Sequence, residues 1–262
     1  MVVTPAVTVP APEPLGRRYG LLTAAAGPLP LPEGRVGGGV TYEPVSCGTA
    51  RRVPLECVDE EDPVAKTFDP GDDWVDGAGF VVYATMQCGA VGARDVEARL
   101  LRRLNNGAQS AVERELGERL TAAATAVPAP VDTAASSVVG ALEQWLYGGG
   151  TGEQGYGSIG YIHAPFRMAS YLHKGTLLST DSAGRHRTRM GSVVVFGDYP
   201  DDGSVFITGH VTTWRAADVA VSPRAQVLNR TNNNLYMLAE QEWAVAYDCV
   251  AGVASYVVEG MS

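Results

Sequence analysis

The residues best suited to acid–base or metal chemistry are four histidines, and they stand far apart in the chain: His163, His173, His186 and His210. Metal-binding helices commonly carry two histidines four residues apart, with a further cysteine or carboxylate at a matching spacing. None of the four histidines forms such a pair. Each is therefore interpreted as an ordinary surface or core histidine, and the sequence predicts no metal site.

A glycine-rich run, GGGTGEQGYGSIGYIHAP, begins at Gly148 and is the second candidate for chemistry. A phosphate-binding loop needs a preceding strand and a Gly-Lys-Ser/Thr ending, and this run has neither. Ser158 also fails to form the nucleophile elbow of a hydrolase, because Tyr156 stands where the first glycine is needed. We therefore predict neither a nucleotide site nor a serine nucleophile.

Two acidic clusters, Glu60-Glu61-Asp62 and Asp72-Asp73, have ligands that a cation could use, but a solvated acidic loop is the preferred interpretation. Asn229-Arg230-Thr231 matches a glycosylation acceptor, which has meaning only in a secreted protein. Met1 is not followed by the charged and then apolar pattern of a secretory signal. With no catalytic set complete, we predict a protein that is not an enzyme and has no cofactor.

The composition is that of a globular protein large enough for one elaborated domain or two small ones. The chain has 262 residues, 45% of them hydrophobic, and a mean hydropathy of -0.01. No apolar run approaches the roughly 18 residues of a membrane span, so no membrane partner is expected. The net charge of -9 argues against a protein that grips nucleic acid through its phosphates. A container that encloses nucleic acid without adhering to it is still compatible with this charge.

The cysteines and the basic residues give two further indications. The four cysteines are Cys47, Cys57, Cys88 and Cys249, and they contain no Cys-x-x-Cys pair. Free thiols are the favoured interpretation and disulfides the alternative. Lys66 and Lys174 are the only lysines. The arginines that make up the rest of the basic residues suit pairing with carboxylates across interfaces.

One long helix is predicted from Arg94 to Ala126, and the other elements are arranged around it. Apolar residues recur at every fourth position, at Val96, Leu100, Leu104, Ala108, Val112, Leu116, Leu120 and Ala124. Because a turn takes about 3.6 residues, this stripe winds around the helix, and its two ends should face different neighbours. Gly107 and Gly117 each cost about 1 kcal/mol relative to alanine. A helix broken at Asn105-Asn106-Gly107 is the alternative.

The regions before this helix are expected to be extended. Residues 1–32 hold seven of the sixteen prolines, so we expect no regular helix or strand there. The segment is interpreted as an arm that lies across a neighbouring subunit, with a disordered terminus as the alternative. Residues 35–80 form a turn-rich acidic loop with short strand-like pieces. Phe80 to Cys88 is predicted as a strand that leads into the helix.

The regions after the helix alternate between helix and strand signals. The linker AVPAPVDTAASS precedes a second predicted helix, Ser137 to Tyr147, with Val138, Leu142, Trp145 and Leu146 on its apolar face. Strands are predicted at 192–196 and 204–211. Alternating apolar residues from Leu235 to Tyr247 predict a long half-buried strand, and residues 254–258 are expected to return beside it as a hairpin partner.

Several stretches carry a family resemblance. FVVYATMQCGAVG is followed by a helix that contains Arg102-Arg103-Leu104 and Ala111-Val112-Glu113. Two more stretches are GYIHAP at 160–165 and LNRTNNNLYMLAEQEWAVAYDCVAGVASYVV near the end. Together they make residues 35–258 resemble major capsid proteins of tailed bacteriophages that infect actinobacteria, which have the Hong Kong 97 fold.

The resemblance implies an α+β capsid fold with five segments. These are an N-terminal arm (1–39), an extended loop (40–79), a peripheral domain with a spine helix (80–130), an axial domain (131–225) and closing peripheral strands (226–262). It also implies a homo-oligomer of pentamers and hexamers in an icosahedral shell that encloses double-stranded DNA without sequence-specific binding. Assembly would take place in the bacterial cytoplasm, and scaffolding, portal and decoration proteins are candidate partners. An encapsulin-like shell and another virion part, such as a tail or connector protein, are the alternatives.

The resemblance further implies candidate assembly residues. Gly148, Gly149 and Gly150 are expected near symmetry axes, where glycine permits close approach. The predicted assembly residues also include four positions of the long helix: Leu100, Leu104, Val112 and Leu116. Some relatives join subunits by an isopeptide bond, for which the matching residues here are Lys66, Asn233 and the assisting carboxylate Glu240.

Overall fold

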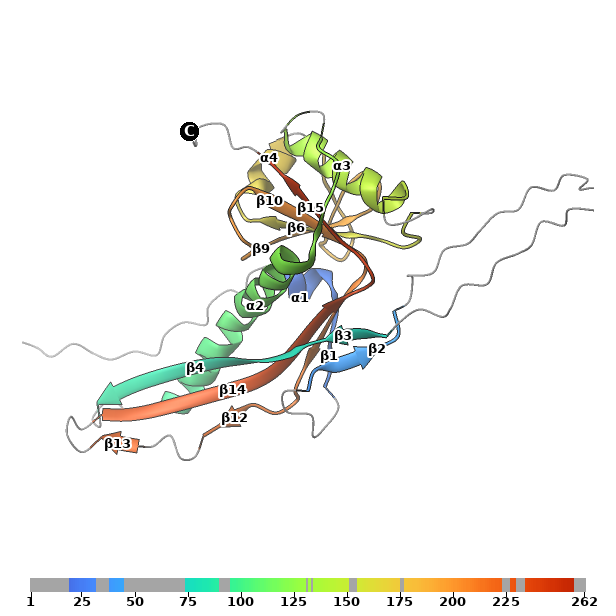
Figure 1. The fold of residues 1–262 in the computed structure, drawn as a ribbon. Helices are drawn as coiled ribbons and strands as arrows, with labels where there is room; N and C mark the ends of the chain where they lie inside the picture. Colours follow the sequence, from blue (N-terminus) through green and yellow to red (C-terminus); the bar gives the residue numbers. More distant parts are fainter. Residues whose placement is uncertain are drawn as a thin grey trace, which may run out of the picture.

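The computed structural model of the chain places a long helix and a long strand ribbon at one end and a second sheet with two helices at the other (Figure 1). It describes residues 19–31, 38–44, 74–89, 95–130, 132, 134–150, 155–174, 177–222, 227–229 and 234–256. Two hydrophobic clusters account for most of the buried residues. One extends along the long helix from the strand ribbon to residues of the second sheet, and the other lies between that sheet and its two helices.

The predicted long helix is α2, Val96–Ala123, and it is unbroken. It starts after Asp95, which adopts the left-handed conformation, and ends where Ala124 becomes extended. Seven of the eight predicted stripe residues are buried: Val96, Leu100, Leu104, Ala108, Val112, Leu116 and Leu120. The stripe also winds as expected, since the helix packs on β4 and β14 while Gly117 approaches Tyr199 and Pro200 of the other end.

The sheet under α2 has six strands and is built on the long strand β14, Asn234–Tyr247. β4, Gly79–Gly89, runs antiparallel to it from Gly89 opposite Asn234 to Gly79 opposite Ala244. On its other edge β14 pairs with β11 (Val211–Arg215), β12 (Ala220–Val221) and β13 (Val227–Asn229). β1 (Ala26–Pro30) joins β11 in parallel, and a separate hairpin-like pair joins β2 (Val40–Tyr42) to β3 (Val75–Gly77).

The second sheet has seven strands in the order β5-β15-β10-β6-β9-β8-β7. In that order they are Thr125–Ala126, Ala251–Ser255, Ser204–Thr208, Tyr161–Pro165, Val193–Gly197, His186–Arg187 and Ser179–Thr180. Helices α3 (Ala135–Tyr147) and α4 (Met168–Lys174) share a core with this sheet. The predicted second helix is thus confirmed, and Val138, Leu142, Trp145 and Leu146 are buried as expected.

Two strand predictions are wrong because the chain crosses between the sheets. Residues 204–211 do not form one strand: β10 ends at Thr208 in the second sheet, and β11 begins at Val211 in the first. A Cβ on the intervening Gly209 would lie 2.6 Å from the carbonyl oxygen of Asp248, so the two crossing segments touch. β15 likewise does not return beside β14 but pairs with β10 and β5.

Two further predictions, on the N-terminal segment and on the cysteines, are wrong. Within residues 1–32 the described part contains a short helix, α1 (Leu21–Ala24), and strand β1, although no regular element was expected. β1 tolerates Pro28 and Pro30 because it is the outer strand of its sheet, where a missing N–H costs little. Cys249 is disulfide-bonded, so the free-thiol prediction is wrong for this residue.

The two glycines inside α2 have opposite surroundings and give a matched test. A Cβ at Gly107 meets nothing within 4 Å, whereas a Cβ at Gly117 would lie 2.8 Å from Cδ of Pro200. We expect Gly107→Ala to raise the free energy of unfolding by about 1 kcal/mol through helix propensity. Gly117→Ala should lower it by about 1–3 kcal/mol through overpacking, as measured by urea unfolding of the unassembled subunit. A shift of both variants in the same direction would contradict this packing.

Candidate assembly surfaces

The four helix positions predicted to serve assembly lie inside the subunit. Leu100, Leu104, Val112 and Leu116 are at most 2% exposed and belong to the core that α2 shares with β4 and β14. A neighbouring copy cannot reach these side chains. Their contribution is to hold the helix on its sheet, and the surfaces available for assembly lie elsewhere.

A buried carboxylate, Glu113, joins three parts of the chain that are distant in sequence. Its Oε1 accepts hydrogen bonds from the backbone N–H of Leu21 at 3.0 Å and from Nε2 of Gln109 at 3.1 Å. Its Oε2 accepts from the backbone N–H of Asp198 at 2.8 Å. The side chain thereby ties the start of α1 to α2 and to the end of β9. We call this arrangement the Glu113 joint, and it fixes the position of α1 relative to α2 and β9.

Arginines fasten the same helix to the edge of the first sheet. Nη1 of Arg119 donates to the carbonyl oxygen of Val245 at 3.0 Å, and Nη2 donates to that of Ala78 at 2.9 Å. Nearer the other end, Nη1 of Arg103 donates to the carbonyl oxygen of Thr85 at 2.8 Å. The helix is thus held to the first sheet by polar contacts at two points along its length.

The backbone conformation and close contacts within the chain require glycine at positions of the predicted glycine loop. Gly149 has a φ of +93°, which disfavours other residues. A Cβ at Gly150 would lie 2.2 Å from the ring of Trp145, and one at Gly148 would lie 2.1 Å from Nε2 of Gln144. A position near a symmetry axis stays a prediction for this loop, of which residues 151–154 lie outside the described part.

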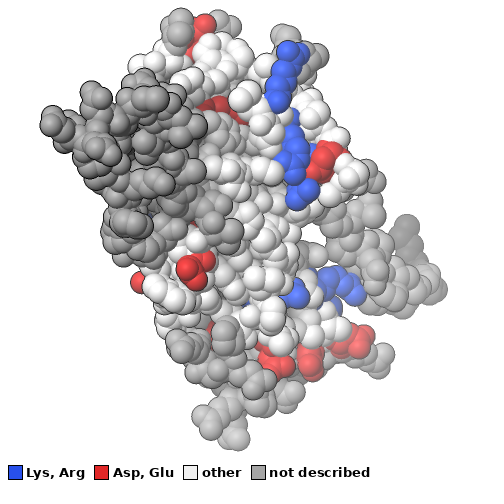
Figure 2. Space-filling view, turned by 90° about the vertical axis from the view of Figure 1, so that its right-hand side faces the viewer, with Lys and Arg blue, Asp and Glu red and all other residues white. Residues whose placement is uncertain are grey.

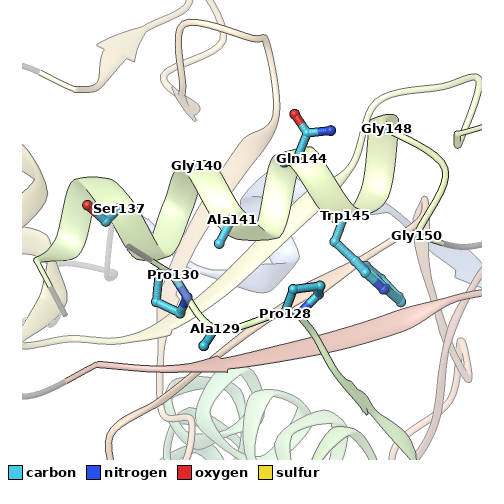
Figure 3. Close-up of a pocket in the computed structure, with 10 residues that line it drawn as sticks. All are labelled: Pro128, Ala129, Pro130, Ser137, Gly140, Ala141, Gln144, Trp145, Gly148 and Gly150. Atoms are coloured by element: carbon cyan, nitrogen blue, oxygen red, sulfur yellow. The ribbon is translucent and has the colours of Figure 1, made fainter. Parts of the chain in front are cut away.

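A groove of about 550 Å³ runs beside this loop, between α3 and the linker at 128–130 (Figure 3). Ala141 and Trp145 point from the helix toward the linker, whose side of the groove is formed by Pro128, Ala129 and Pro130. Apart from Gln144 and Ser137, the lining residues are small or apolar. We call this the α3 groove.

The candidate cross-link residues are not brought together in the described structure. Lys66 and Asn233 lie outside the described residues. Glu240 is half-buried in β14, where it faces Tyr83 of β4 on one side and Ala220 of β12 on the other. The isopeptide bond therefore stays a prediction.

The histidines take structural positions. His163 is fully buried, with Nδ1 at 3.0 Å from the hydroxyl of Tyr199 and Nε2 at 3.0 Å from Oγ1 of Thr208. Burial lowers its pKa from 6.5 to about 3, so the ring stays neutral. His173 and His186 pack edge to face at 5.1 Å. Among the described residues no group of three potential metal ligands occurs, and none of their helices is long and apolar enough to cross a membrane.

Charges on the surface are arranged as local groups. Figure 2 shows Lys and Arg side chains in separate clusters along one side of the visible face, with several acidic residues at its lower end. Arg185 and Arg187 both donate from Nε to Oδ2 of Asp181 at 2.9 Å. The backbone N–H of Arg185 and the guanidinium of Arg187 hold the pKa of this carboxyl well below its usual range. Such pairing suits local ion pairs better than broad phosphate binding.

Comparisons with known proteins find solved structures with a similar fold. No protein-family model and no curated protein matches the sequence. The chain is similar to the capsid of a native GTA particle, with a TM-score of 0.57, 14% identity, and coverage of 98% of this chain and 96% of that one. For the capsid of an empty GTA particle the TM-score is 0.57, the identity 13%, and the coverage 98% and 96%.

A chain of Gordonia phage Cozz gives a TM-score of 0.55 at 10% identity, over 98% of this chain and 92% of that one. Similarity at these identities concerns the fold. The predicted α+β, Hong Kong 97-like capsid fold is therefore confirmed. The division into arm, extended loop, peripheral domain and axial domain stays a prediction.

The buried His163 makes subunit stability depend on pH. Below pH 6.5 the unfolded chain binds a proton that the folded chain refuses until about pH 3, so stability is full above 6.5 and is lost as the pH falls. When the pH falls from 7 to 5, this histidine should lower the free energy of unfolding by about 2 kcal/mol. We expect the fall in unfolding free energy, measured with urea at both pH values, to shrink by that amount in His163→Gln. Equal falls in both proteins would contradict the assignment.

Proposed function

We propose that this chain is the major capsid protein of a tailed phage and that many copies build the closed icosahedral shell around its double-stranded DNA. The observation that carries the proposal is a shared fold over 98% of the chain with the capsid of a GTA particle. A fold does not by itself determine a function. The surface and the charge of this chain supply independent support.

Large apolar side chains at the surface support a role in assembly. On the outer face of β4, Val81 is 46% exposed and Tyr83 is 66% exposed, and Tyr236 of the neighbouring β14 is 38% exposed. Trp74, just before β3, is 65% exposed. Aromatic residues are enriched where protein surfaces are buried against one another. We propose that such positions are covered by other copies in the shell.

The charge balance supports a container for DNA. A net charge of -9 does not favour tight binding to phosphates, so DNA would be enclosed without sequence-specific contacts. In this proposal the subunit has a structural and non-enzymatic role, occupies pentamers and hexamers of the virion capsid, and assembles in the bacterial cytoplasm. The N-terminal arm at residues 1–39 stays a prediction, and scaffolding, portal and decoration proteins are the expected partners.

Electron microscopy of the chain expressed in bacteria tests the proposal. We expect closed shells of uniform diameter that sediment far faster than the 27.6 kDa subunit. In virions, the same shells should carry the ultraviolet absorbance of DNA. Particles that enclose a protein cargo in place of DNA would instead identify an encapsulin-like shell. A chain that stays monomeric, both alone and when co-expressed with the proteins of its own virion, would overturn the proposal.

A further inference from the structure

A tight turn, Thr188–Ser192, is held rigidly on one flank of α3. The hydroxyls of Thr188 and Ser192 donate to Oε1 of Glu143 at 2.5 and 2.6 Å. The backbone N–H of Thr188 donates to the carbonyl oxygen of Ser192 at 3.0 Å. Nη1 of Arg187 donates to the carbonyl oxygen of Gly191 at 2.8 Å. The base of this turn is therefore ordered before any partner arrives.

The tip of the turn presents an apolar side chain to solvent. Met190 is 70% exposed, the largest exposure among the large hydrophobic residues of the described structure, and Arg189 beside it is also exposed. Methionine adapts to apolar gaps of irregular shape. Because the turn is already ordered, burial of this side chain by a partner costs little further backbone entropy. The tip thus has the properties of a contact residue.

The α3 groove has complementary properties. Its volume of about 550 Å³ is ample for one side chain, and its walls are formed mainly by Pro128, Pro130, Ala141 and Trp145. At the N-terminal end of α3 stands the exposed carboxylate of Asp132. Hydrogen bonds with the Ser137 side chain and the backbone N–H of Ala134 lower the pKa of this carboxyl, so it is charged at neutral pH. Asp132 does not itself line the groove, but its hydrogen-bond partner Ser137 does, so a negative charge stands next to this end of the groove. The groove therefore matches an apolar tip with a positive neighbour.

The turn and the groove lie on different flanks of the same helix. Successive residues of a helix are rotated by about 100°, so Glu143, which holds the turn, and Ala141, which lines the groove, point about 160° apart. Glu143 also lies about 12 Å along the axis from Ala135, where the helix begins after Asp132. The turn of one copy therefore does not reach the α3 groove of the same copy. A contact between two different patches repeats head to tail, and it produces a ring when the rotation closes.

We propose that Met190 of one copy enters the α3 groove of the next copy, while Arg189 pairs with Asp132 at the end of that groove. The proposal rests on the proposed function, because it supplies a repeated contact from which pentamers and hexamers are built. The partner is a second copy of this chain, since the turn and the groove of one chain match each other both in apolar character and in charge.

A zero-length cross-link tests this contact directly. In the variant Arg189→Lys, carbodiimide treatment of assembled particles should join the introduced amine to the Asp132 carboxyl as an amide. The water lost in this reaction converts the carbodiimide to its urea. Only two other lysines, Lys66 and Lys174, compete. We expect a ladder of multimers on denaturing gels and, by mass spectrometry, a linked pair of peptides containing positions 132 and 189. Asp132→Asn should abolish both.

Substitutions that fill the α3 groove test the contact independently of the cross-link. Ala141→Arg should block the groove and repel Arg189, and it should raise the subunit concentration needed for assembly by about tenfold. Met190→Ala should act in the same direction through lost burial. Ala98→Arg is the matched control, because it makes the same change at an exposed helix position of α2. Urea unfolding of each unassembled subunit verifies that the fold is retained.

The results distinguish failure of the contact between Met190 and the α3 groove from failure of the proposed shell function. Shells that form but give no 132–189 link, and that assemble equally well with Ala141→Arg, would overturn the contact and leave the shell function intact. Rings that carry the link but never close into shells would support the contact and count against the shell. A chain that forms no oligomer in any condition would overturn both.

Discussion

The buried carboxylate of Glu113 is the constraint on which the arrangement of the subunit depends. A carboxylate that is 0% exposed is costly unless its oxygens accept hydrogen bonds. Here two of the donors are backbone N–H groups, those of Leu21 and Asp198, and a backbone donor fixes the path of the chain as well as a side chain. The start of α1, the helix α2 and the end of β9 are therefore set in one geometry. The proposed shell needs this property, because contacts between copies repeat accurately only when each copy has the same shape.

The connection between the two sheets adds a second polar centre. Chain segments cross from one sheet to the other at Gly209-His210 and again after Tyr247. The buried Asp248 accepts a hydrogen bond from the hydroxyl of Tyr42 at 2.7 Å, and the hydroxyl of Tyr156 accepts one from the backbone N–H of His210 at 2.8 Å. Burial raises the pKa of Tyr156 to about 12 and also raises that of Tyr42. Both phenols therefore remain protonated, and the crossing is held over the physiological pH range.

Local periodicity predicted the elements whose packing is regular along their whole length. The four-residue repeat of α2 and the two-residue repeat of β14 are such cases, because the apolar residues of both elements pack into one shared core. The break at Gly209 and the pairing of β15 depend on contacts with distant segments, which periodicity does not contain. Glu113 was visible only as an acidic residue beside the apolar stripe. The available signal was its position directly after Val112, on the same flank of the helix as Gly117. The pairing of the tip at Met190 with the α3 groove required the fold itself, since Met190 stands 40 positions after Gly150, the last residue that lines the groove.

Hydrogen exchange of the unassembled subunit tests the Glu113 joint most directly. The backbone N–H of Leu21 stands at the first residue of the short helix α1, where an amide without a hydrogen-bond acceptor would exchange rapidly. With the joint intact, we expect this amide and that of Asp198 to exchange slowly, within the range of amides in the middle of α2. Glu113→Gln should accelerate both by about tenfold or more, because a hydrogen bond to a charged acceptor contributes about 1.5–3 kcal/mol. Exchange of Leu21 at the rate of an unfolded peptide in the unchanged protein would contradict the joint and the fixed shape that it gives the subunit.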